Sequence, residues 1–78
     1  MNKSPQFYAE VKAKREIMFD RYGGMMSLKD LTKELGFGSV NTTKKWVEEV
    51  GLSYVRVTGH PRFETDIVAR EIVRRRVC

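Results

Sequence analysis

Cysteine and histidine are almost absent from this chain of 78 residues. Its one cysteine, Cys78, cannot form an internal disulfide and has no candidate metal ligand near it in the sequence. So little cysteine fits a reducing, cytoplasmic setting. The one histidine, His60, has no nucleophile or second ligand at a suggestive spacing. We therefore expect no metal site, no cofactor and no catalytic residue.

Long apolar runs are also missing. No stretch approaches the roughly 20 apolar residues that span a bilayer, and no apolar segment follows Lys3 as it would in a secretory leader. The chain has neither a glycine-rich phosphate loop nor a pair of carboxylates in a recognisable catalytic pattern. These absences argue against a membrane protein, an enzyme and a protein with a small-molecule substrate.

Acidic residues are outnumbered by basic ones. Lysine and arginine number 15 against 10 aspartates and glutamates, for a net charge of +5. This balance favours a polyanionic partner such as double-stranded DNA. Because the excess is spread along the chain, a binding surface has to arise from how the folded protein arranges its charges.

The length supports one domain over residues 1–78, which begins with a helix at 5–22. Ser4 and Pro5 form a helix-start signal. One apolar stripe of this helix is expected to pack inward, and it contains Phe7, Val11, Met18 and Tyr22. A thinner strip of Ala9, Ala13 and Ile17 lies on the far side. That strip is either an ordinary exposed helix face or a contact with a second copy or another protein.

Residues 27–50 predict a helix-turn-helix. Ser27 and Asp30 form a capping-box-like pair before a helix at 28–35, which Gly36 ends. Ser39 then caps a helix at 40–50, which Gly51 ends. Two short helices that meet at a glycine-containing turn are typical of this motif. The inward face of the second helix is expected to contain Val40, Thr43, Val47 and Val50.

The hydrophobic period then changes to that of strands. Tyr54 to Val57 alternates, 58–61 has turn chemistry, and 62–64 reads as a short return strand. This predicts a two-stranded hairpin, or wing, within 54–64. A last helix at 66–76, capped by Thr65 or Asp66, completes the chain. The expected fold is α+β and mostly α, a winged helix-turn-helix with a two-stranded β-hairpin wing and an extra N-terminal helix.

The second helix of the motif carries the candidate DNA readers. In a helix-turn-helix this helix enters the major groove with its N-terminal residues against the base edges. Asn41 can pair with adenine through two hydrogen bonds, and Thr42 can bond a base or a phosphate. Lys44 and Lys45 suit phosphates, and Ser39 suits both the cap and a phosphate. Glu48 and Glu49 would repel phosphates, so the N-terminal end is expected to lie deepest. The alternative is an ordinary solvated helix face.

The hairpin supplies three further candidates. Arg56 lies on its first strand, and His60 and Arg62 lie at its expected tip. Arginine is favoured where a narrow minor groove concentrates negative potential. The alternatives are edge-strand charges that block aggregation, for the two arginines, and a plain turn residue, for His60.

Residues 27–73 also resemble a known family. The features are a first helix that reads "LTKELG", a serine seven residues before a tryptophan (Ser39 and Trp46), and "GL" followed by the strand "VRV". The return strand then leads into a helix beginning Asp66-Ile67. This order resembles the phage-type excisionases and the wider MerR-like winged-helix group. The turn 36–39 is one residue longer than the family pattern, Thr43 replaces an apolar residue, and the helix at 5–22 is not part of the excisionase module.

The resemblance implies a small accessory DNA-binding protein that directs a recombinase or integrase towards excision. Contact with the recombinase would involve the C-terminal segment, where Arg74, Arg75 and Arg76 lie. The alternative for these three arginines is that they add phosphate contacts. Related proteins are transcriptional regulators. A protein-interaction adaptor that keeps the fold without DNA contacts is a further alternative.

Overall fold

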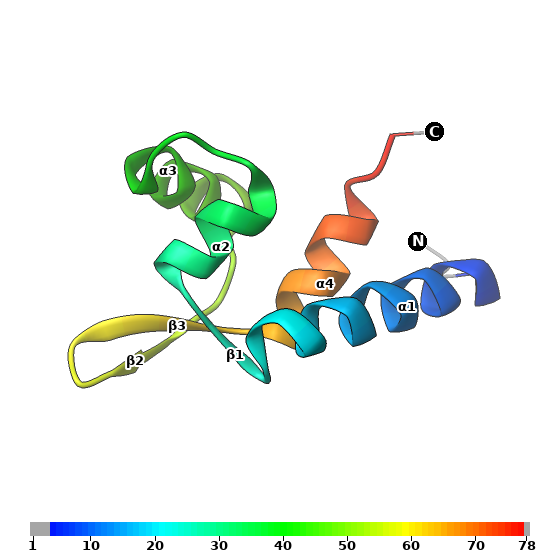
Figure 1. Cartoon of the computed structure of the whole chain (residues 1–78). Helices are drawn as coiled ribbons and strands as arrows, with labels where there is room; N and C mark the ends of the chain where they lie inside the picture. The colour runs from blue at the N-terminus through cyan, green and yellow to red at the C-terminus, as the bar shows by residue number, and fades with distance from the viewer. Residues whose placement is uncertain (1–3, 78) are drawn as a thin grey trace.

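The computed structural model describes residues 4–77 and has an α+β fold that is mostly helical. Helix α1 (Pro5–Tyr22) begins where expected, since the Phe7 amide donates to the Ser4 hydroxyl at 3.1 Å. The helix ends at Gly23. Figure 1 shows α1 at one end of the molecule and the β2–β3 hairpin at the other. The expectation about Cys78 concerns a residue outside the described range.

The predicted hairpin within 54–64 is present, but a third strand that was not predicted joins it, so the sheet has three strands. Strand β1 (Met25–Ser27) pairs antiparallel with β3 (His60–Glu64), which also pairs with β2 (Val55–Val57), in the order β1-β3-β2. Met26 lies opposite Phe63, and both side chains are buried. The segment after α1 is a strand because it passes along the free edge of β3.

The turn of the hairpin is shorter than expected. Val57 pairs with His60, so the turn consists of Thr58 and Gly59, and His60 and Pro61 belong to β3. Both turn residues have positive φ, +49° for Thr58 and +81° for Gly59, as hairpin turns of this length require. Pro61 lies opposite Arg56, next to the hydrogen-bonded pair that flanks the turn. In that position its missing N–H does not interrupt the β2–β3 ladder.

Helices α2 (Leu28–Leu35) and α3 (Val40–Val50) occupy the expected ranges. The capping box is present, since Ser27 and Asp30 exchange backbone-to-side-chain bonds of 3.0 and 3.1 Å. Gly36 and Gly51 take the left-handed conformation at the two C-termini. The amides of Phe37 and Leu52 reach back to the carbonyls of Thr32 and Val47, which completes a Schellman motif at each helix end.

Thr43 of α3 is fully buried against α2. Its hydroxyl lies 2.6 Å from the hydroxyl of Thr32, which in turn donates to the Leu28 carbonyl at 2.8 Å. The Thr43 hydroxyl also lies 3.4 Å from the Ser39 carbonyl, to which it can donate. The pair satisfies a buried polar group and fixes how the two helices meet.

Helix α4 (Thr65–Arg74) starts one residue earlier and ends two residues earlier than the predicted 66–76. The capping prediction is also wrong, because Glu64 occupies the cap position and makes no side-chain cap bond. The Thr65 hydroxyl donates instead to the Gly23 carbonyl at 2.7 Å. That tertiary contact ties α4 to the end of α1.

A single hydrophobic cluster joins these elements. Each of the four helices contributes to it, as do the sheet and the loop before β2. Its buried members are Met18, Met26, Leu31, Val47, Leu52, Phe63, Val68 and Ala69. Val40, which was expected to face inward on α3, is 38% exposed.

Glu34 connects α2 to α1. Its carboxylate accepts from Lys14 Nζ at 2.7 Å, Tyr22 Oη at 2.8 Å and Arg21 Nη1 at 2.9 Å. Burial acts to raise the pKa of Glu34, but the bonds from Lys14, Tyr22 and Arg21 outweigh it and hold the pKa below its ordinary value. Burial and the bond to Glu34 together raise the pKa of Tyr22. The N-terminal helix is therefore fixed to the α2–α3 pair by charge as well as by packing.

Within residues 4–77, no helix has both the length and the apolar character that a membrane crossing requires.

Candidate nucleic-acid interface

The N-terminal half of α3 presents its polar side chains to solvent. Asn41, Thr42, Lys44 and Lys45 are all exposed, as predicted. Ser39 is the N-cap, since the Thr42 amide donates to its hydroxyl at 3.4 Å, and the two hydroxyls lie 3.2 Å apart. The helix dipole makes this end of α3 the electropositive one.

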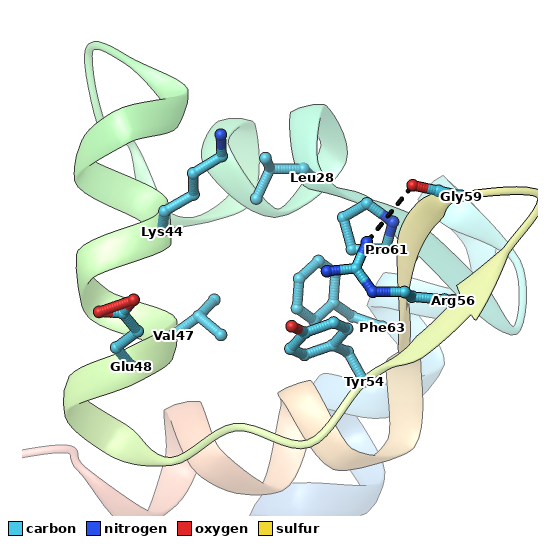
Figure 2. A pocket seen from close by; sticks show the side chains of 9 residues that line it. All are labelled: Leu28, Lys44, Val47, Glu48, Tyr54, Arg56, Gly59, Pro61 and Phe63. Atoms are coloured by element: carbon cyan, nitrogen blue, oxygen red, sulfur yellow. Dashed lines mark hydrogen bonds between the residues drawn. The ribbon is translucent and has the colours of Figure 1, made fainter.

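A cleft of about 400 Å³ separates α3 from the hairpin. Figure 2 shows Lys44 on the helix side and Arg56 on the hairpin side, above a floor that includes Val47 and Phe63. The remaining lining residues are Leu28, Glu48, Tyr54, Gly59 and Pro61. The cleft therefore has an apolar floor and a cation on each wall.

The Arg56 side chain is held in place by its own hairpin. Its Nη1 donates to the Gly59 carbonyl at 3.4 Å, and its guanidinium lies 5.9 Å from the centre of the Tyr54 ring. That distance is within the range of a cation–π contact. Arg56 lines the cleft, and its guanidinium has further donors from which an anion there can accept.

His60 and Arg62 lie on the opposite face of the sheet from the cleft. Neighbouring residues of a strand point to opposite faces, and Pro61 and Phe63 face the cleft. Arg62 is half-buried and donates to the Pro61 carbonyl at 3.2 Å, while His60 is exposed. The structure thus brings Arg56 together with the α3 residues but separates His60 and Arg62 from them.

Among residues 4–77, Glu48 is the one acidic residue that lines the cleft, one helical turn beyond Lys44. Glu49 is exposed but does not line it. With Lys44 and Arg56 the three charged lining groups sum to +1. The cleft is therefore more basic at the N-terminal end of α3 than at its C-terminal end.

The C-terminal arginines are mostly engaged by carboxylates. Arg74 and Arg75 both pair with Glu71, and Arg76 Nη1 lies 2.9 Å from the Glu10 carboxylate on α1. Arg75 and Arg76 lie beyond the end of α4. The Arg76–Glu10 pair joins the C-terminal segment to α1, and all three pairs reduce the free positive charge of the segment.

Sequence reasoning missed the contributions of Tyr54, Pro61 and Glu48 to the cleft. The signal for Tyr54 was present, because residues two apart in a strand share a face and Arg56 was already a candidate. Pro61 was missed because it was placed in the turn.

Among residues 4–77, no three histidine, cysteine, aspartate or glutamate side chains are grouped so as to hold a metal ion. A comparison of the chain with protein-family models, curated proteins and solved structures gave no match.

Proposed function

We propose that this chain is a small double-stranded DNA-binding protein with a winged helix-turn-helix arrangement. Helix α3 enters the major groove, and the β2–β3 hairpin contacts the adjoining backbone. The observation that carries this proposal is the cleft in which Lys44 of α3 and Arg56 of β2 face the same space. One DNA strand would pass between them.

The charge distribution supports a tilted docking. Asn41 and Lys45 lie at the N-terminal end of α3, whereas Glu48 and Glu49 lie nearer its C-terminus. Phosphates are attracted to the first end and repelled by the second. The N-terminal end would therefore sit deepest in the groove, with Asn41 at a base edge.

The proposal that the hairpin contacts DNA depends on Arg56 more than on Arg62. Arg56 faces the cleft, while Arg62 lies on the other face of the sheet and is half-buried. Arg62 and His60 would contact DNA only if the DNA backbone passed around the hairpin tip to the other face of the sheet.

The biological role follows from the resemblance to phage-type excisionases described above. We assign the chain as an accessory factor of that kind, which binds DNA beside a recombinase and directs it towards excision. A MerR-like transcriptional regulator would use the same surface. In a reconstituted recombination assay, excision should require the protein if it is an excisionase-like factor. Excision should proceed equally without it if it is a transcriptional regulator.

An adaptor without DNA contacts is favoured by one observation, the carboxylate of Glu48 in the cleft. A DNA-binding protein and an adaptor differ in whether they bind DNA with an affinity that falls as salt rises. Fluorescence anisotropy with a labelled random-sequence duplex should show binding at low salt. If Lys44, Lys45 and Arg56 each neutralise one phosphate, the logarithm of affinity should fall with the logarithm of salt with a slope of about −3.

A charge-matched pair of variants sharpens this test. Lys44→Gln with Arg56→Gln removes both cations of the cleft, and Arg70→Gln with Arg74→Gln removes the same charge from α4. The first variant should lose most binding and about two units of slope, and the second should bind almost as wild type. Absence of binding at low salt would favour the adaptor, and equal losses in both variants would show that DNA binding does not depend on the cleft.

A further inference from the structure

We infer that α1 mediates antiparallel self-association through its outer face, which makes the protein a two-fold symmetric dimer. The outer face comprises Pro5, Gln6, Tyr8, Ala9, Lys12, Ala13, Glu16, Ile17, Phe19 and Asp20. This inference does not rest on DNA binding, because α1 lies at the opposite end of the molecule from the β2–β3 hairpin (Figure 1), and the cleft lies between α3 and that hairpin.

Every residue of the outer face is exposed. It includes three large apolar side chains, since Tyr8 is 61%, Ile17 50% and Phe19 42% exposed. The opposite face of the same helix is in contact with the rest of the protein through Met18 and Tyr22. Helix α1 thus has two apolar faces, and the fold uses one of them.

The charges of the outer face have no partners within residues 4–77. The other acidic and basic groups of α1 pair with Glu34, Asp66 or Arg76, but no ion pair is found for Lys12, Glu16 or Asp20. Within the helix, Lys12 stands N-terminal to Glu16, the less favourable order for a pair at this spacing. These groups are therefore available to a partner.

The sequence of the face is complementary to itself when reversed. In an antiparallel pair that sets Lys12 of one copy opposite Glu16 of the other, symmetry creates this ion pair twice. The same register places Tyr8 opposite Asp20, where the phenol can donate to the carboxylate. It also places Phe19 opposite Ala9, a large side chain against a small one that leaves room for it.

Other arrangements of the same face are less favourable. A parallel pair would set Lys12 against Lys12 and Glu16 against Glu16, and like charges so placed repel. Shifting the antiparallel register by one helical turn sets either Lys12 against Lys12 or Glu16 against Glu16 at the axis, although the second shift also sets Lys12 opposite Asp20. Of these three antiparallel registers, the one described above is the one that pairs opposite charges on the outer face without a like-charge contact at the axis.

The contact is limited to one helix. It is smaller than the roughly 800 Å² per partner of a standard interface, so association is expected at high protein concentration. Two copies held close on DNA would associate more readily.

Sedimentation equilibrium without DNA tests the inference. Wild type should show a reversible dimer, and Lys12→Glu or Glu16→Lys should each weaken it about tenfold, because each change converts two attractive pairs into two repulsive ones. The double variant Lys12→Glu with Glu16→Lys should restore wild-type association. Lysine and glutamate are both good helix formers, so circular dichroism should show each variant folded.

Cysteine cross-linking checks the register independently. In a Cys78→Ser background, Ala13→Cys lies close to the axis and should form an intermolecular disulfide. Gln6→Cys lies about 24 Å from its own copy in this register, at 1.5 Å per residue, and should not. The inference would be overturned if wild type stayed monomeric at high concentration, or if Ala13→Cys and Gln6→Cys cross-linked equally. It would also be overturned if the single charge reversals at Lys12 and Glu16 had no effect, or if the double variant failed to restore association.

Discussion

Asn41 and Lys45 stand one helical turn apart on α3 and differ in chemistry. An amide can read adenine through two directed bonds, whereas an ammonium is a point charge with little directional demand. We expect Asn41→Ala to relax sequence preference, with a loss of about 1–3 kcal/mol at one base pair. Lys45→Ala should weaken binding to all sequences alike. Affinities for a set of single-base-pair variants of a selected site measure both, and equal losses across that set for both substitutions would remove Asn41 as a reader.

Arg56 and Arg62 provide a second comparison, because they lie on opposite faces of one hairpin. Arg56→Ala should weaken DNA binding and reduce the magnitude of the salt slope by about one, since Arg56 faces the cleft. Arg62→Ala should leave the slope nearly unchanged. Urea midpoints for both variants separate lost binding from lost stability. A larger effect at Arg62 would place the DNA on the other face of the sheet.

The β2–β3 hairpin contains a local conflict at Thr58. Threonine is β-branched, yet here it takes φ +49° beside Gly59 in a two-residue turn. Asparagine tolerates this conformation, so we expect Thr58→Asn to raise the free energy of unfolding by about 1 kcal/mol. Ser53→Asn, at an exposed loop residue outside the positive-φ region, should be nearly neutral. Chemical denaturation of both variants decides this, and a destabilised Thr58→Asn would show that the hydroxyl bond to the Val57 carbonyl matters more.

The helices were predictable because their ends carry strong local signals. Ser27 with Asp30, and the glycines at 36 and 51, define α2 and α3 through bonds made within a few residues. Strand β1 was not predictable in that way. Its residues, Met25–Ser27, show no alternating pattern, and they form a strand only because β3 lies beside them. The same distinction explains Thr65, whose hydroxyl caps nothing locally and bonds to Gly23 far earlier in the chain.

The candidate site was predictable on α3 but only in part on the hairpin. Helical spacing fixes which residues of 40–50 face outward, and Asn41, Thr42, Lys44 and Lys45 are exposed as expected. For the hairpin, the position of the turn decides which face each residue occupies. Placing His60 and Pro61 in the turn hid the fact that Arg62 and Arg56 lie on different faces.

Glu34 joins the N-terminal helix to the rest of the molecule and gives stability a pH dependence. Its folded pKa lies below the ordinary value of 4.5, so its contribution is present above that pH and is lost as pH falls through the folded pKa. Glu34→Gln should lower the free energy of unfolding at pH 7 by about 1–3 kcal/mol. It should also flatten the decline of stability below pH 5.

Urea unfolding of wild type and Glu34→Gln between pH 7 and pH 3 measures this effect. Glu49→Gln is the matched control, because Glu49 is exposed. If wild type and Glu34→Gln lost stability in parallel as pH falls, Glu34 would not be the group responsible.

The central claim is that α3 and the hairpin form one DNA-binding surface. Titration of the ¹⁵N-labelled protein with a short duplex at two salt concentrations tests it most directly. We predict that the backbone amides of residues 39–45 and 54–59 shift together, and less at the higher salt. If no amide shifts, or if only those of α1 do, then the cleft is not a DNA site and the claim is contradicted.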